Sequence, residues 1–240
     1  MSRPPKPVME VKRPIAPTEC SFEWGQALGP VTNGEGERDE SRTTLRWAPA
    51  LAYAGEMARP LRIAPPGGIF HVTARGNRRQ EIFFDDRDRL RFLEMFGTAV
   101  SRHDWRCHAY CLMPNHFHLM IETPAGDISA GMQRLNGGYA QWFNRRHEFD
   151  GHLFQSRFYS VLLESNWHLL ELSRYIVLNP VRARLCRDPA EWRWSSYRAY
   201  MALARRPEFL TVDWLLEQFG SDSQRARTVF RRFVGEALTA

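Results

Sequence analysis

The sequence lacks any apolar run of the roughly 18 residues that a membrane-spanning helix needs. Its N-terminus also lacks the basic and then apolar pattern of a secretion signal. We therefore expect a cytoplasmic protein with no membrane partner. Cysteine is scarce as well, with only Cys20, Cys107, Cys111 and Cys186 in 240 residues. Their spacing is not typical of a disulfide framework, so reduced thiols are expected.

Lysine is almost absent, because only Lys6 and Lys12 are found in the whole chain. From Met57 onward the chain has 26 arginines and no lysine, against 19 aspartates and glutamates. The net charge of +6 and the pI of about 9.4 favour a polyanionic partner. Nucleic acid is the first candidate.

Composition divides the chain into three parts. Residues 1–56 are rich in proline and charge and show no helical or strand periodicity, so a disordered leader is expected. The sequence that begins at Met57 leads directly into the first predicted strand, so Met57 is a candidate for the true start of translation and the upstream start would then be mis-assigned. Residues 57–200 form the main predicted domain. Residues 201–240 contain two helical patterns, and their basic bias favours a DNA-binding appendage over helices packed on the main domain.

The hydrophobic pattern of the main domain predicts alternating strands and helices. Strands are expected at 67–77, 105–113, 116–122 and 151–164, and helices at 85–104, 127–147 and 165–180, the last ending at Pro180. The order β-α-β-β-α-β is the split βαβ pattern of a ferredoxin-like sheet. The predicted class is therefore α+β, an antiparallel sheet with helices on one face, followed by C-terminal helices.

The strand at 116–122 carries two histidines at alternate positions. Successive side chains of a strand point to opposite faces, so His116 and His118 share one face. Phe117, Leu119 and Ile121 share the other, which is plainly a core face. Two imidazoles directed at a common point suggest a metal site, although this pattern alone is a weak signal.

The helix at 127–147 presents a tyrosine on its apolar side. Tyr139 lies at helical spacing among the apolar residues Leu135 and Phe143, and packing is the ordinary role of such a residue. Gly137 and Gly138 precede it and permit close approach to the sheet. We therefore predict that Tyr139 meets the histidines across the sheet. Other tyrosines at 159 and 175 are the alternatives if its role is packing.

Several blocks together resemble the HUH single-tyrosine endonucleases, more narrowly the IS200-like transposases and their REP-associated tyrosine transposase branch. The resemblance covers about residues 57–200. The blocks are HVTARGNRRQEIFFDDRDR, YCLMPNHFHLMIE, YAQWFNRRH, GHLFQSRFYS, YIVLNPVRARL and EWRWSSYRAY. The last two favour the REP-associated branch.

The resemblance implies an enzyme that nicks and joins single-stranded DNA near hairpins. His116 and His118 would bind a loosely held Mg²⁺ or Mn²⁺, since imidazole is not the favoured ligand of Mg²⁺. Tyr139 would be the nucleophile and would form a 5′-phosphotyrosine link. The REP-associated branch implies a monomer, whereas the IS200-type transposases work as dimers, so a dimer stays open. When bound to DNA, the protein is expected to associate with the nucleoid.

Further site residues follow from the same resemblance. In the family the third metal ligand is a polar side chain about one turn beyond the tyrosine. Here that position is Phe143, so Asn144 is the nearest candidate. The residues expected to contact DNA are basic or amide side chains near the presumed site, namely Arg75, Asn77, Arg78, Arg145, Arg146 and Arg157.

Two other classes of protein remain open. Cys107 and Cys111 precede the two histidines, and two thiolates with two imidazoles make a sound zinc set. However, a C-x₃-C spacing on an extended strand separates the sulfurs by about 13 Å. A nucleic-acid-binding protein without catalysis is the other alternative.

Overall fold

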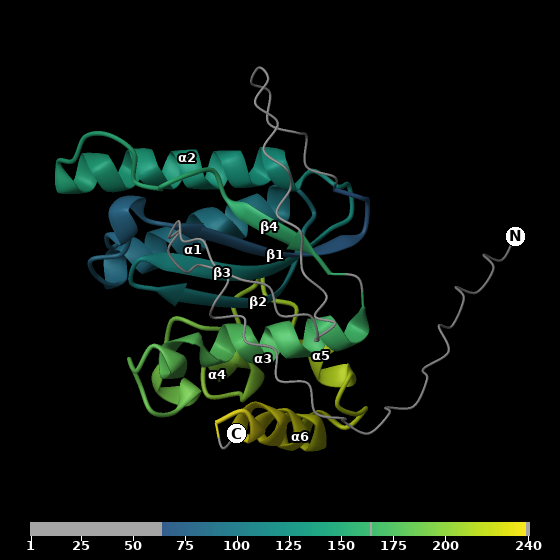
Figure 1. Cartoon of the computed structure of the whole chain (residues 1–240). Helices are drawn as coiled ribbons and strands as arrows, with labels where there is room; N and C mark the ends of the chain where they lie inside the picture. Colours follow the sequence, from purple (N-terminus) through teal and green to yellow (C-terminus); the bar gives the residue numbers. More distant parts are fainter. Residues whose placement is uncertain (1–63, 164, 239–240) are drawn as a thin grey trace, which may run out of the picture. The chain divides into compact units, whose positions relative to one another are not determined.

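The computed structural model describes residues 64–163 and 165–238 (Figure 1). The expectations for residues 1–56 therefore lie outside the described part of the chain. None of the described helices is both long and apolar enough to cross a membrane.

A four-stranded antiparallel sheet forms the centre of the main domain. Its elements follow the chain as β1 (Gly68–Arg75), α1 (Asp86–Arg102), β2 (Arg106–Met113), β3 (His116–Thr123), α2 (Ile128–His147) and β4 (Tyr159–Leu162). The strand order in the sheet is β2-β3-β1-β4, and each neighbouring pair is antiparallel. This arrangement confirms the predicted split βαβ fold.

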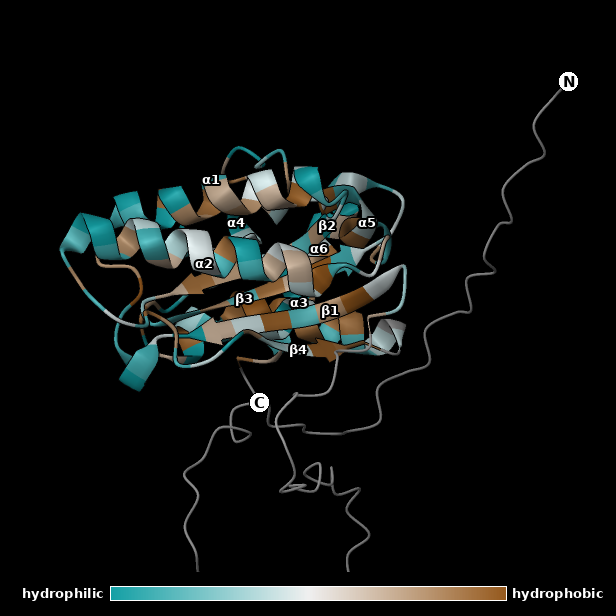
Figure 2. Ribbon diagram, turned by 90° about the horizontal axis from the view of Figure 1, so that it is seen from above, coloured by the Kyte–Doolittle hydropathy of each residue, from teal (hydrophilic) through white to brown (hydrophobic). Residues whose placement is uncertain are grey.

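The two faces of the sheet are covered by different helices. α1 and α2 pack on the face that carries Phe117 and Leu119, as the amphipathic patterns predict (Figure 1). Figure 2, seen from the side of these helices, shows them running roughly along the strands, with many hydrophilic residues on their outer surfaces. α3 (Asn166–Arg182) covers the other face, where Leu172 and Ile176 pack against Met120. The prediction that the two helices of the split βαβ unit lie on one face is confirmed, and the next helix, α3, covers the opposite face.

An ion-pair network joins α1 to α2. Asp85 caps α1 by accepting a hydrogen bond from the backbone N–H of Asp88 at 3.0 Å. Asp88 is fully buried and contacts both Arg146 and His147 of α2. A buried carboxylate needs such partners to offset its lost hydration, so this network fixes how the two helices pack.

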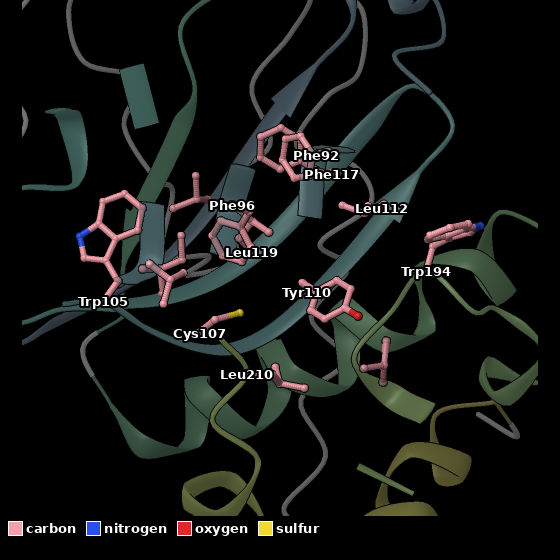
Figure 3. Close-up of a cluster of buried hydrophobic side chains, with 14 of the residues drawn as sticks. Phe92, Phe96, Trp105, Cys107, Tyr110, Leu112, Phe117, Leu119, Trp194 and Leu210 are labelled. Carbon is pink, nitrogen blue, oxygen red and sulfur yellow. The ribbon is translucent and has the colours of Figure 1, made fainter. Parts of the chain in front are cut away.

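The C-terminal residues belong to the same hydrophobic core. After the 3₁₀ turn η3 (Pro189–Glu191) come α4 (Tyr197–Tyr200), α5 (Val212–Glu217) and α6 (Ser223–Glu236). Leu210, Leu215 and Phe230 join the cluster that contains Phe117, and Figure 3 places Leu210 next to Cys107. The backbone N–H of Thr211 donates to the Cys107 carbonyl at 2.8 Å. The prediction of a separate appendage at 201–240 is therefore wrong, because its apolar residues complete the core beside β2.

Two predicted boundaries also differ from the structure. α3 continues through Pro180 to Arg182, although proline removes one helical N–H donor. β4 covers only Tyr159–Leu162 of the predicted strand at 151–164. The segment before it forms an isolated bridge, between Phe154 and Gly76, instead of a continuous ladder.

Candidate active site

The two histidines of β3 lie on the face that α3 covers. Their ring centroids are 4.9 Å apart, and His118 is buried while His116 is partly exposed. In the β1–β3 ladder Arg75 lies opposite His116, and Thr73 lies opposite His118. Directly opposed residues share a face, so these two residues of β1 border the histidine pair.

The hydrogen bonds of Asn115 define the tautomer of His116. The amide nitrogen of Asn115 donates to the carbonyl of Arg79 at 2.9 Å, which leaves its oxygen facing His116. That oxygen is 2.6 Å from His116 Nδ1, so Nδ1 must carry the hydrogen. His116 Nε2 then has a free lone pair, which is the state that a metal ion requires.

His118 has a second histidine as its neighbour. His71 of β1 is buried, and its Nε2 lies 3.0 Å from His118 Nδ1. The two rings are stacked with centroids 5.2 Å apart. His118 Nε2 is buried and has no hydrogen-bond partner within residues 64–163 and 165–238. An unsatisfied buried nitrogen at this position indicates a site for a ligand.

Burial keeps these imidazoles neutral. It lowers the pKa of His71 to about 4. Burial and then the charge of Arg75 lower the pKa of His116 to about 4. The pKa of His118 is also well below its usual value because of burial, with smaller effects of its charged neighbours. At neutral pH all three rings are therefore uncharged, as metal ligation requires.

α3 brings a tyrosine to the histidines. The ring centroid of Tyr175 is 5.5 Å from that of His118 and 6.0 Å from that of His71, with an edge-on geometry in both pairs. Tyr175 is partly exposed. Burial raises its pKa, whereas the charges of Arg182 and Arg75 and a hydrogen bond from Asn179 act in the opposite direction. The arrangement places a partly exposed tyrosine beside His118, which is a candidate metal ligand, and beside His71.

Asn179 lies one helical turn beyond Tyr175. Its amide nitrogen donates to the backbone carbonyl of Tyr175 at 2.9 Å, and the side chain is partly exposed. The guanidinium of Arg182 lies 5.3 Å from the centroid of the Tyr175 ring. The sequence analysis named Tyr175 only as an alternative to Tyr139 and did not single out Asn179 or Arg182. The signal was present in YIVLNPVRARL, where a polar residue follows a tyrosine at the spacing expected of the third ligand.

Tyr139 lies on the other side of the sheet, so the prediction that it meets the histidines is wrong. It is fully buried between α2 and the sheet, and its hydroxyl donates to the Ile82 carbonyl at 2.6 Å. Its ring packs against Phe83 and Phe92. Burial raises the pKa of Tyr139 strongly. The apolar face of α2 meets the apolar face of β3, which is the one opposite the histidines.

Asn144 is also excluded from the histidine face. It belongs to α2, and its amide donates to the carbonyl of Gly151 at 2.9 Å. Its prediction as third metal ligand is therefore wrong. Within the described ranges, no group of three or more His, Cys, Asp and Glu side chains is arranged to hold a metal ion. A metal bound here would need the two imidazoles together with an amide, water or phosphate oxygen.

The predicted DNA-contacting residues fall in several places. Arg75 is partly exposed beside His116, whereas Asn77 and Arg78 are exposed in the turn η2 (Asn77–Arg79). This turn continues β1, and the backbone N–H of Gly76 donates to the Asn115 carbonyl at 2.8 Å. The turn therefore lies next to the histidine motif. Arg145 on α2 and Arg157 before β4 are exposed as well.

Arg146 has a structural role in this fold. Its two terminal nitrogens bind the Asp85 carboxylate at 2.8 and 2.6 Å, and it also contacts buried Asp88. A guanidinium held by two carboxylates has little capacity left for a phosphate. The prediction of Arg146 as a DNA contact is therefore wrong.

The zinc alternative fails because of a β-bulge. The β2–β3 register shifts between Cys107 and Ala109. Cys107 therefore packs in the core with Tyr110, whereas Cys111 packs with Met113 on the opposite face. Burial raises the pKa of both thiols strongly. The two sulfurs cannot join the histidines around one ion.

Comparisons with known proteins agree with this fold. Residues 67–179 match the family model described as "Transposase IS200 like". A Haemophilus influenzae protein assigned to the REP-associated tyrosine transposases is 21% identical over 159 residues, which cover 62% of this chain and 88% of that protein. The solved structure of a REP-associated tyrosine transposase bound to a REP hairpin is 19% identical, with a TM-score of 0.52. That alignment covers 65% of this chain and 92% of the other. The predicted resemblance is confirmed over the matched residues, and the structural likeness shows the fold.

Proposed function

We propose that the chain, whose residues 67–179 match the family model described as "Transposase IS200 like", nicks and rejoins single-stranded DNA next to a hairpin. The nucleophile of the proposed reaction is the hydroxyl of Tyr175. The observation that carries the proposal is the position of this ring beside His118 and His71, on the face opposite Tyr139.

Tyr175 fits the role of nucleophile for three reasons. It is partly exposed, so a phosphate can approach its hydroxyl. Arg75 and Arg182 are cations whose charges favour the phenolate, and the same charges attract a phosphate. It also precedes Asn179 by one turn, which is the family spacing between nucleophile and third ligand. Tyr139 is fully buried, and the residue one turn beyond it is Phe143, which cannot bind a metal.

The donor set fits a divalent cation. His116 and His118 each have an Nε2 whose lone pair can bind a metal ion. Asn179 has an amide oxygen on the facing helix. Imidazole nitrogen is not a favoured ligand of Mg²⁺, whereas an amide oxygen suits both Mg²⁺ and Mn²⁺, so a weakly held, exchangeable ion is expected. When bound, Mg²⁺ or Mn²⁺ would polarise the scissile phosphate and offset its developing charge.

The proposed reaction has two symmetrical steps. The Tyr175 oxygen bonds to phosphorus and loses its proton to water, while the bond between phosphorus and the 3′ oxygen breaks. The leaving oxygen takes up a proton and becomes a 3′-hydroxyl, and the 5′ end stays linked to Tyr175 as a phosphodiester. Attack by a 3′-hydroxyl on that link reverses the chemistry and joins two strands. The phosphodiester count is unchanged, so no high-energy cofactor is needed.

Hairpin DNA is the proposed partner. The relative whose fold this chain shares was solved with a REP hairpin. Asn77 and Arg78 are exposed in the turn next to the histidine motif, and Arg157 is exposed before β4. Cationic side chains of this kind bind phosphates without reading sequence. Nucleophile and histidines come from one chain, which supports action as a monomer.

The test is covalent capture on a denaturing gel. Labelled single-stranded oligonucleotides with varied hairpins are incubated with the full chain and Mn²⁺. We expect a protein-linked band that disappears with EDTA and with Tyr175→Phe. Tyr159→Phe is the matched control, because Tyr159 is 66% exposed on β4 and should leave the band unchanged. A band that persists in Tyr175→Phe would overturn the assignment.

A further inference from the structure

We propose that His71 is a positioning residue that fixes the tautomer and ring orientation of His118. The proposal rests on the proposed function, because it takes His118 as a metal ligand. His71 would not touch the metal or the DNA. It would act only by accepting a hydrogen bond from its neighbour.

The geometry of the two rings carries this inference. His71 Nε2 and His118 Nδ1 are 3.0 Å apart, and the rings are stacked at an angle of 17°. Between two neutral imidazoles one nitrogen must donate and the other must accept. His118 Nε2 has no partner in the described part of the chain, so it is the nitrogen available to a cation. His118 Nδ1 must then carry the hydrogen, and His71 Nε2 must accept it.

The other histidine of the motif has an equivalent support. The Asn115 oxygen accepts from His116 Nδ1 at 2.6 Å, and the opposite end of the same amide is held by the Arg79 carbonyl. Each histidine therefore has an acceptor for Nδ1–H and an unused Nε2. Two chemically different residues, from a turn and from β1, serve the same purpose.

Burial makes the His71 contact effective. His71 is 6% exposed and His118 is 5% exposed, so water does not compete easily for this hydrogen bond. The backbone ladder between β1 and β3 holds the two rings in register. Without an acceptor, His118 would lose its preferred tautomer and the restraint on its ring. Outer-shell partners of metal-binding histidines typically contribute about 10- to 100-fold in affinity.

The first measurement is the tautomer of His118 in the full chain without metal. Long-range ¹H–¹⁵N spectra of histidine-labelled protein distinguish the two ring nitrogens. Assignment comes from a His118→Gln spectrum. We expect hydrogen on Nδ1 in the parent protein and a shift toward hydrogen on Nε2 in His71→Leu. Hydrogen on Nε2 in the parent would overturn the proposal.

The second measurement is the affinity for Mn²⁺ alone, followed by electron paramagnetic resonance of the free ion. We expect His71→Leu to weaken binding by about 10- to 100-fold, and His71→Gln, whose amide oxygen can accept, to restore most of it. Equal affinity in parent and His71→Leu would contradict the proposal while leaving the metal site intact. If His118→Ala also binds Mn²⁺ like the parent, the metal site itself is wrong, and both proposals fail. Should His71→Leu not fold, His71→Asn, which is too short to accept, replaces it.

Discussion

Each face of the sheet is packed against a helix that carries a tyrosine, but the two tyrosines differ in exposure and in their neighbours. On the face under α1 and α2, Tyr139 is fully buried and its hydroxyl is bound by a carbonyl. On the face under α3, Tyr175 is partly exposed and meets two histidines. The first face packs the fold, and the second is the face where we propose the chemistry. A tyrosine on an amphipathic helix is therefore informative only once the partner of its hydroxyl is known.

The contrast extends to the buried polar groups. Under α1 and α2 the carboxylate of Asp88 is satisfied by Arg146 and His147. On the α3 face the His118 Nε2 has no partner within the described residues. A satisfied network stabilises a fold, whereas an open donor set can bind a ligand. The predictions below test this division, beginning with the largest effect.

Replacing His118 with alanine should lower covalent product formation by at least about 100-fold, because metal stabilisation of the phosphate contributes several kcal/mol. Hairpin binding, measured by fluorescence anisotropy without metal, should change little, since phosphate contacts come from arginines. Loss of binding with an intact fold would assign the histidine to DNA recognition. Full activity would remove it from the site.

Asp88→Ala should lower the free energy of unfolding by about 3 kcal/mol, because it leaves Arg146 and His147 without their buried partner. Chemical denaturation measures this change. Asp86→Ala is the matched control, since its ion pair with Arg193 is exposed on both sides and should contribute less than about 0.5 kcal/mol. Similar losses in the two variants would contradict the account of the α1–α2 network.

Tyr139→Phe should cost about 1 kcal/mol of stability, because only the hydrogen bond to the Ile82 carbonyl is lost. The rate of covalent product formation should stay within about twofold of the parent rate. Such a ratio corresponds to a change of well below about 1 kcal/mol in the activation free energy. Thermal unfolding and the gel assay are run on the same preparation. A stable variant without covalent product would restore Tyr139 as nucleophile.

Arg78→Ala should weaken hairpin binding a few-fold and reduce its salt dependence by about one unit of slope. Arg78 is exposed in the turn beside the histidine motif. Arg102→Ala, exposed at the end of α1, is the control and should bind as the parent does. Equal weakening in both variants would indicate that only net charge matters.

Much of the fold was predictable, because alternation along β3 separated Phe117 from His118 and element order specified the sheet. The prediction that Tyr139 meets the histidines was wrong although the pattern was sufficient. The apolar face of α2 had to meet Phe117 and Leu119, and not the histidines. Other features had no local signal. The bulge between Cys107 and Ala109 arises from strand pairing, and passage of α3 through Pro180 depends on tertiary packing.

The contact between His71 and His118, on which the proposed role of His71 rests, had no signal in the sequence. A lone histidine on a strand is ordinarily a packing residue, and its partner is 47 positions away. Only the register of β1 against β3 brings the two rings together. Similarly, the sequence could not show that Arg146 forms ion pairs while Arg145 stays exposed. The ion pairs of Arg146 depend on Asp85 and Asp88, which lie far away in the sequence.

The most direct test is to identify which tyrosine carries the DNA. The covalent product is treated with nuclease and trypsin, and the modified peptide is identified by mass spectrometry. Cleavage after arginine places Tyr175 in YIVLNPVR, Tyr139 in LNGGYAQWFNR and Tyr159 in FYSVLLESNWHLLELSR, so the three cannot be confused. We predict a nucleotide remnant on YIVLNPVR alone. A remnant on LNGGYAQWFNR would contradict the assignment of the chemistry to the histidine face.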